Sequence, residues 1–167
     1  PGIFVMDLAS VTDGRNQSWV NATIANQLAL YVTLYSPLQM AADLPEHYEQ
    51  FMDAFQFIKD VDIDWLQSKY LLAEPGEYVV VARQGKKNGQ WFCGGVTDDH
   101  KRTLEVPLQF LDPEKTYEAT IYRDAEDAHY KENPQAYVIE KKTVTFHDFL
   151  PITMAPGGGF AISFEEK

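Results

Sequence analysis

The first part of the chain has a helical hydrophobic pattern. Within residues 20–34, apolar side chains recur every three or four positions, which is the spacing of an amphipathic helix. Residues 48–59 repeat this spacing. The pair Ser36-Pro37 ends the first helix, because proline lacks a backbone donor and disfavours helical geometry in the residue before it. The apolar run 38–42 is typical of a short buried strand, so the order of elements predicts an α/β layer arrangement.

Beyond about residue 62 the pattern changes to short extended segments that are separated by turn signals such as Lys87-Asn88-Gly89 and Asn133-Pro134. β-Branched and aromatic residues bounded by such turns are typical of strands. The predicted strands are residues 78–83, 90–97, 103–108, 117–123, 137–145, 149–154 and 160–164. Seven or eight strands at this spacing predict an antiparallel β-sandwich. The expected fold class is therefore α+β, with a helical segment first and a sandwich after it.

The first segment is too short to form a domain alone. Two helices and one buried strand cannot build a parallel sheet, because parallel strands need neighbours on both edges. The chain also opens at Pro1 without an initiator methionine or a signal-peptide pattern. We therefore expect residues 1–70 to be the end of a larger α/β domain, and residues 71–167 to be a β domain that could fold by itself.

Charge and cysteine content exclude several classes of function. The 167 residues contain 25 acidic and 14 basic side chains, a net charge of −11. This charge argues against a nucleic-acid backbone or an anionic membrane surface as partner. Cys93 is the single cysteine, which excludes an internal disulfide, and its apolar neighbours predict a buried thiol. The four histidines lack metal-ligand spacing, so we expect surface residues and no metal site.

Few carboxylates occupy positions that suggest chemistry. Asp43 follows the apolar run 38–42; at the carboxyl end of a barrel strand it would face a catalytic site. Asp43 could equally cap the helix that follows it. The pair Asp98-Asp99 is adjacent in sequence, which is not the facing geometry that acid–base catalysis needs. The glycines at 157–159 predict a turn into the last strand, because no lysine and helix follow them as a phosphate loop requires.

Several segments resemble one known family in order and spacing. They are residues 1–4, 28–32, 35–45, 77–83 and 155–159, and the stretch 31–45 is the most specific. Together they look like the carboxyl-terminal part of glycoside hydrolase family 97, the bacterial α-glucosidases and α-galactosidases. Members of this family have an amino-terminal β-sandwich, a central (β/α)8 barrel and a carboxyl-terminal antiparallel β domain.

The resemblance implies a division of the chain and a role for each part. Residues 1–70 would supply the last barrel elements, with the eighth strand near 36–42, and residues 71–167 would form the terminal β-sandwich. The parent would be a calcium-assisted, exo-acting, periplasmic α-glycosidase that acts on oligosaccharides. Its catalytic carboxylates and calcium ligands precede Pro1, so we expect this chain to be structural and inactive without the missing amino-terminal part. Gln39, Met40 and Asp43 would lie at the rim of the barrel mouth.

A carbohydrate-binding module is the alternative reading. Sandwich domains often present exposed aromatic rings to sugars, and the candidates here are Trp91, Tyr117, Tyr122, Tyr130 and Tyr137. The same residues could instead fill the core of the sandwich. A row of exposed rings would favour the binding module, and buried rings would exclude it. A third possibility is an active complex with the missing amino-terminal part, which requires a large exposed apolar patch.

Overall fold

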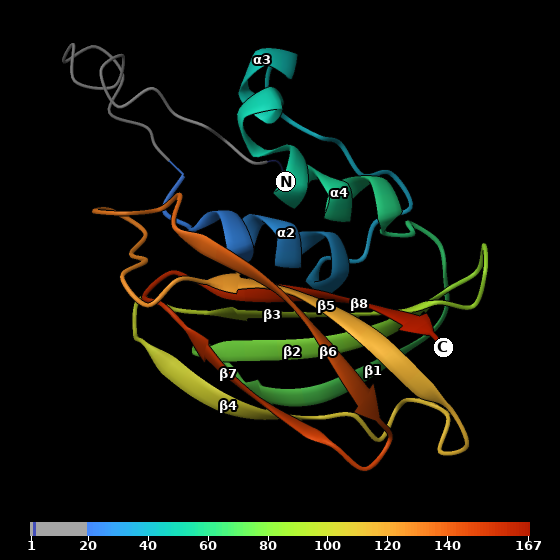
Figure 1. Cartoon of the computed structure of the whole chain (residues 1–167). Helices are drawn as coiled ribbons and strands as arrows, with labels where there is room; N and C mark the ends of the chain where they lie inside the picture. Colours follow the sequence, from blue (N-terminus) through green and yellow to red (C-terminus); the bar gives the residue numbers. More distant parts are fainter. Residues whose placement is uncertain (1, 3–19) are drawn as a thin grey trace, which may run out of the picture.

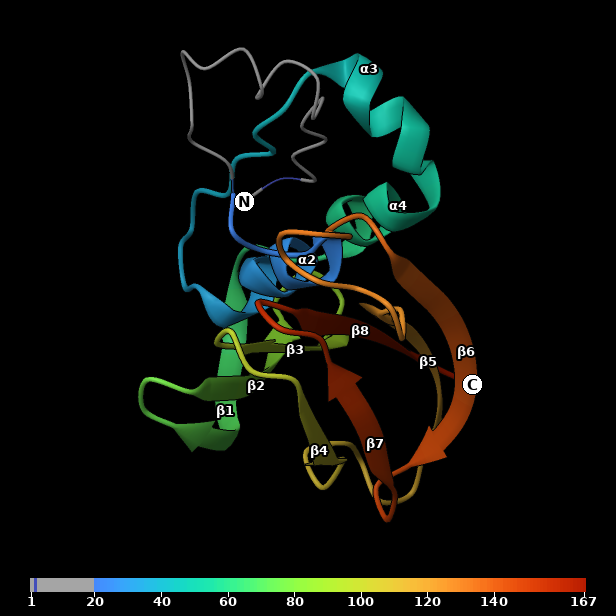
Figure 2. The same cartoon turned by 90° about the vertical axis from the view of Figure 1, so that its left-hand side faces the viewer.

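The computed structural model describes residue 2 and residues 20–167, so the expectations for Pro1 and for residues 3–4 lie outside the described part. The described chain forms three layers (Figures 1 and 2). Helices lie on one face of a six-stranded sheet, and a two-stranded sheet lies on the other. Among the described residues, no helix is long and apolar enough to cross a membrane.

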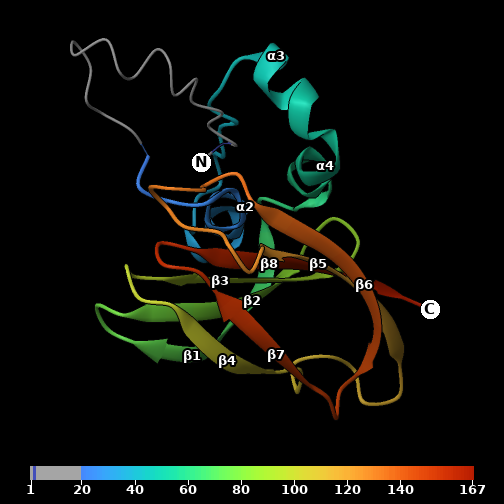
Figure 3. The same cartoon turned by 60° about the vertical axis from the view of Figure 1, so that its left-hand side comes forward.

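The large sheet is antiparallel throughout, with the strand order β1-β2-β3-β8-β5-β6. Figure 3 shows β1 and β6 at its opposite edges. Its strands are β1 (Trp65–Glu74), β2 (Tyr78–Gly85), β3 (Trp91–Thr97), β5 (Thr116–Asp124), β6 (Tyr137–Thr145) and β8 (Gly159–Glu166). The small sheet pairs β4 (Arg102–Pro107) with β7 (Phe149–Met154) in antiparallel register. The predicted antiparallel sandwich is confirmed, and each of the predicted strands is present.

The large sheet is buried on both faces near its centre. Alternate side chains of β3 enter different cores: Trp91 and Cys93 pack toward β4 and β7 with residues such as Ile152, whereas Phe92 packs under the helices with Phe57. Cys93 is fully buried, as predicted. Burial raises the pKa of its thiol well above the usual range, so the thiol is unreactive at neutral pH.

Helix α2 (Ile24–Thr33) crosses β3 and β8 and confirms the first predicted helix. Its apolar residues, among them Leu28 and Val32, face the sheet. The helix approaches β3 closely at Gly94, where a Cβ atom would lie 2.8 Å from the carbonyl oxygen of Ala29. The second predicted helix is present as a nearly continuous run of α3 (Pro45–Tyr48), a 3-10 turn (Glu49–Phe51) and α4 (Met52–Asp60).

The predicted buried strand near residues 36–42 is wrong. This segment has no strand structure, and Leu38 and Met40 are 73% and 67% exposed. No described strand lies beside it, and a strand cannot exist without a hydrogen-bonding neighbour. The end of a (β/α)8 barrel is therefore not evident in the described residues. Strand β1, which the sequence analysis missed, crosses the expected division at residues 70/71, and α2 shares a core with the sheet.

Candidate functional site

The three candidate rim residues lie in the loop between α2 and α3. The carbonyl of Met40 accepts a hydrogen bond from the Tyr31 hydroxyl at 3.3 Å, and the side-chain amide of Gln39 donates to the carbonyl of Leu34 at 3.3 Å. The Asp43 carboxylate accepts from the backbone N–H of Leu44 at 2.8 Å and lies 2.5 Å from Nδ1 of His47. Asp43 thus contacts the first turn of α3, as expected for a residue that stabilises a helix start.

The aromatic candidates for sugar stacking do not form an exposed row. Trp91, Tyr117 and Tyr122 are buried. Tyr130 and Tyr137 are half-buried, and the Tyr137 hydroxyl donates to Asp53 at 2.7 Å. A sugar ring stacks only on an accessible aromatic face, so these five residues give no support to the carbohydrate-binding alternative.

A buried polar contact fixes the first turn of α2 to the sheet. The hydroxyl of Thr23, the N-cap residue, accepts from the backbone N–H of Asn26 and donates to Oδ1 of Asp124, the last residue of β5. Oδ2 of Asp124 accepts backbone N–H bonds from Ala155 and Gly159, both at 2.8 Å. The turn at 155–159 therefore wraps around this carboxylate, which confirms the predicted glycine turn before the last strand.

Burial dominates the electrostatics of Asp124. It raises the pKa of this carboxyl group to about 6, although the three hydrogen bonds and the nearby Arg123 favour the ionised form. Gly158 fits the same turn because it has no side chain: a Cβ atom there would collide with Oδ2 of Asp124. The role of the Asp124 carboxylate is structural, because both of its oxygens already accept hydrogen bonds from within the chain.

The other end of α2 is fixed by a buried arginine. Arg83 of β2 is 3% exposed, and its Nε donates to the carbonyl of Val32 in the last turn of the helix at 2.6 Å. Its Nη1 donates to the hydroxyl of Ser68 on β1 at 2.5 Å. A cation at a helix C-terminus satisfies free carbonyls and the helix dipole. Arg83 thus joins α2, β1 and β2.

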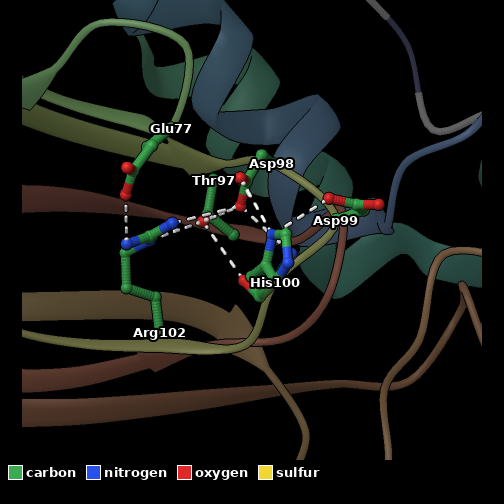
Figure 4. A network of polar contacts seen from close by, with 6 residues as sticks. All are labelled: Glu77, Thr97, Asp98, Asp99, His100 and Arg102. Carbon is green, nitrogen blue, oxygen red and sulfur yellow. Dashed lines mark hydrogen bonds and ion pairs between the residues drawn. The ribbon is translucent and has the colours of Figure 1, made fainter.

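A network of polar side chains lies where β2 begins and β3 turns into β4 (Figure 4). Nη1 of Arg102 lies 2.8 Å from Glu77, and its Nη2 lies 3.3 Å from Asp98. Nδ1 of His100 lies 3.1 Å from both Asp98 and Asp99. Arg102 also donates to the hydroxyl of Thr97 at 3.2 Å. We call these residues the rim network: Glu77, Thr97, Asp98, Asp99, His100 and Arg102.

Charge compensation governs the rim network. Although desolvation opposes the change, hydrogen bonds from His100 and Arg102 lower the pKa of Asp98 to about 2. The same hydrogen bond with Asp98, together with the negative charges of Asp98 and Asp99, raises the pKa of His100. The acidic pair is visible in the sequence, whereas the roles of Arg102 and Glu77 are not. The ion pair between these two residues forms only when β4 comes close to the start of β2.

The rim network does not fit a calcium ion. Ligand atoms of Asp98, Asp99 and His100 lie within 4.8 Å of one another, and they form the one such group among the described residues. Calcium takes six to eight oxygen ligands. This group offers two carboxylates and a nitrogen, and the cation Arg102 is already paired with Asp98. The network is better suited to neutralising carboxylates than to holding a metal.

A shallow hollow of about 500 Å³ opens beside the rim network. Its apolar lining includes Ala73, Val79 and Val96, and Tyr70 of β1 borders it. Tyr70 is 70% exposed. The turn from β1 to β2 and the residues Thr97 and Asp98 complete its border. The hollow thus combines an apolar lining, a protruding aromatic side chain and a border where Arg102 pairs with Glu77 and Asp98.

The β-sheet region carries a family signature. Residues 64–165 match the family model described as "Glycosyl-hydrolase 97 C-terminal, oligomerisation". The chain belongs to glycoside hydrolase family 97. The resemblance noted in the sequence is thereby confirmed, and the match starts one residue before β1 and extends into β8.

Two curated alpha-galactosidases and one solved family 97 enzyme are similar to most of this chain. This chain is 36% identical over 143 residues to a retaining alpha-galactosidase of Bacteroides thetaiotaomicron. The aligned region covers 86% of this chain and 21% of that protein. A probable retaining alpha-galactosidase of Streptomyces bingchenggensis is 31% identical, with 93% of this chain and 23% of that protein covered. A family 97 enzyme from Pseudoalteromonas, solved in complex with acarbose, is 49% identical with a TM-score of 0.86, over 88% of this chain and 23% of that one.

The chain therefore spans about a fifth to a quarter of the length of these three proteins. It corresponds to their carboxyl-terminal portion, and the described residues contain no catalytic site of the kind that hydrolases use. The candidate functional surface of the chain is the hollow with its rim network.

Proposed function

We propose that this family 97 chain is the carboxyl-terminal part of an exo-acting α-glycosidase and that its own task is to join copies of that enzyme. The observation that carries the proposal is the family match at residues 64–165, whose description names oligomerisation. The matched residues include nearly all of the antiparallel sandwich and exclude α2, α3 and α4. The sandwich is thus the part to which an assembly role applies.

The substrate of the parent enzyme is an α-glucoside or an α-galactoside. The relative from Bacteroides thetaiotaomicron is named a retaining alpha-galactosidase. The Pseudoalteromonas enzyme, which has the higher identity, was solved with acarbose and with panose. Panose is a trisaccharide of α-linked glucose, so this neighbour favours an α-glucoside. Assays of the full-length enzyme with both classes of substrate decide between them.

The calcium ion and the periplasmic location of the parent enzyme stay predictions from the family. The rim network does not fit calcium, and the family resemblance places the expected ligands before Pro1. No step of the proposed role runs through a metal. Depletion of calcium from the full-length enzyme should lower its hydrolytic rate without changing its solution mass, because the rim network beside the proposed contact surface does not offer the oxygen ligands that calcium takes.

The loop and helices before the sandwich would contact the rest of the parent enzyme. Large apolar side chains gather there at 48–73% exposure: Leu34, Tyr35, Leu38, Met40, Leu44 and Met52. A contiguous exposed apolar surface marks an interaction site. We propose that the barrel of the enzyme covers this segment, which would also bring Gln39, Met40 and Asp43 toward the barrel mouth.

The proposal is tested on the full-length enzyme. Solution mass is measured by light scattering, and hydrolysis is measured with an α-glucoside and an α-galactoside. The expected result is an assembly of two or more copies that hydrolyses at least one of the two substrates. A monomeric intact enzyme at micromolar concentration would refute the assembly role, whereas absence of hydrolysis of both substrates would refute the proposed activity.

A further inference from the structure

The hollow beside the rim network has a self-complementary form. Tyr70 protrudes next to an apolar recess formed by Ala73, Val79 and Val96. In the strand register Tyr70 lies opposite Val81 and Ala73 lies opposite Val79, which places these side chains on the face of the sheet that α2 covers only in part. A knob and a recess side by side on one face can interlock with their own copies across a two-fold axis.

The charge around the hollow permits a second copy to approach. The whole chain carries a net charge of −11, so two copies repel each other at most surfaces. Of the carboxylates at the border of the hollow, Glu74 has no ion pair among the described residues. The carboxylates Glu77 and Asp98 at the border are bound by Arg102. The rim network therefore reduces the repulsion at this place.

We infer that the face formed by Tyr70, Ala73, Val79 and Val96 binds the same face of a second copy of this chain, with the ring of Tyr70 entering the recess of the partner. Arg102 acts as a positioning residue that keeps the border carboxylates compensated. The inference rests on the proposed function, because it assigns the assembly role to one surface.

Irregular pairing of β1 favours a contact through side chains over an extension of the sheet. Strand β1 is an edge strand, and an unpaired edge could otherwise join another strand. Its pairing with β2 is irregular between Trp65 and Gln67 and again between Tyr70 and Leu72. Such bulges twist an edge and disfavour continued pairing. The exposed face beside the edge remains as the contact surface.

Three other large apolar residues of the strands are exposed, and none of them lines a described hollow: Leu66 on β1 (59%), Val138 on β6 (36%) and Phe149 at the start of β7 (54%). Single exposed apolar residues are normal on protein surfaces. Phe149 therefore supplies a matched control for Tyr70, since both are exposed aromatic residues at strand positions.

The test compares Tyr70→Glu and Phe149→Glu in the full-length enzyme by sedimentation over a concentration series. Replacement of a central aromatic residue weakens an interface by roughly 30-fold or more. The expected result is that Tyr70→Glu raises the dissociation constant by at least this factor, while Phe149→Glu leaves it within about 3-fold. Hydrolytic activity per protomer should be the same in both variants, which shows that each is folded.

A third variant, Arg102→Met, tests the positioning role. It leaves Glu77 and Asp98 without their cation, so the dissociation constant should rise about 10-fold at low salt, and the difference should shrink at about 1 M salt because charges are then screened within about 3 Å. An oligomeric wild type whose mass is unchanged by Tyr70→Glu would overturn the inference and leave the assembly role intact. A monomeric wild type would instead refute the proposed function.

Discussion

The hydroxyl of Thr23 donates a hydrogen bond to Oδ1 of Asp124 at 2.6 Å, although the two residues lie 101 positions apart in the sequence. Both side chains are buried. The contact joins the start of α2 to the end of β5 and to the turn before β8. Together with Arg83 at the other end of the helix, it makes α2 an integral layer of the family 97 carboxyl-terminal portion.

Removal of the Thr23 hydroxyl should destabilise the fold. Thr23→Ala removes an N-cap and leaves Asp124 one hydrogen bond short, and each loss costs about 1 kcal/mol. We expect the free energy of unfolding to fall by about 2 kcal/mol in chemical denaturation. Thr23→Ser keeps the hydroxyl and should lose less than half of this amount. Equal losses in the two variants would show that the hydroxyl is unimportant.

Asp124 should make the stability depend on pH. Because the pKa of Asp124 is raised to about 6 in the folded state, the folded protein holds this proton more tightly than the unfolded chain does. The stabilising contribution is complete below pH 3.8 and is lost as the pH rises through about 6, and it amounts to about 3 kcal/mol. Asp124→Asn mimics the protonated group, so the difference in unfolding free energy between variant and wild type should change over this range. A constant difference from pH 4 to 7 would contradict the raised pKa.

Loss of the buried arginine should destabilise the chain far more than loss of a surface cation. Arg83→Met leaves the carbonyl of Val32 without its donor, at a cost of about 2–3 kcal/mol. The matched control is Lys86→Met, because Lys86 pairs with Asp64 at the surface with both side chains about half exposed. Such pairs contribute about 0–1 kcal/mol. Similar melting temperatures for the two variants would argue against the role of Arg83 at the end of α2.

The turn around Asp124 should not tolerate a side chain at Gly158. The Cβ atom of Gly158→Ala would collide with the Asp124 carboxylate and crowd the backbone of Ala155. We expect the free energy of unfolding to fall by about 3 kcal/mol, because the costs of overpacking and of a broken buried hydrogen bond add to each other. Gly89→Ala is a useful comparison: its φ of +74° costs about 1 kcal/mol, but the surrounding space is open. A smaller loss at Gly158 than at Gly89 would contradict the described turn.

The strands that the sequence predicted are those with a clear burial pattern. Strand β5 alternates between buried and half-buried positions over most of its length, and such a pattern is readable without the fold. Strand β1 was missed because its residues from Leu66 to Tyr70 are all exposed, so they lack the hydrophobic alternation of a half-buried strand. The predicted strand at 38–42 is wrong for the opposite reason. Its residues are largely apolar, yet the described part of the chain provides no strand for them to pair with.

The candidate surface depends on contacts between segments that are distant in the sequence. The pair Asp98-Asp99 is visible in the sequence as a local cluster. The ion pair between Glu77 and Arg102 in the same network forms only when β2 and β4 come together in the fold. Tyr70 gave no signal because a single tyrosine between Lys69 and Leu71 is unremarkable in sequence. The family resemblance identified the portion of the enzyme but not the surface that this portion presents.

The most direct test of the account is the solution mass of the full-length wild-type enzyme, measured by sedimentation over a range from nanomolar to micromolar protein. The account predicts an oligomer that dissociates on dilution or remains assembled throughout. A mass equal to one chain at every concentration would contradict the claim that the carboxyl-terminal sandwich joins copies of the enzyme.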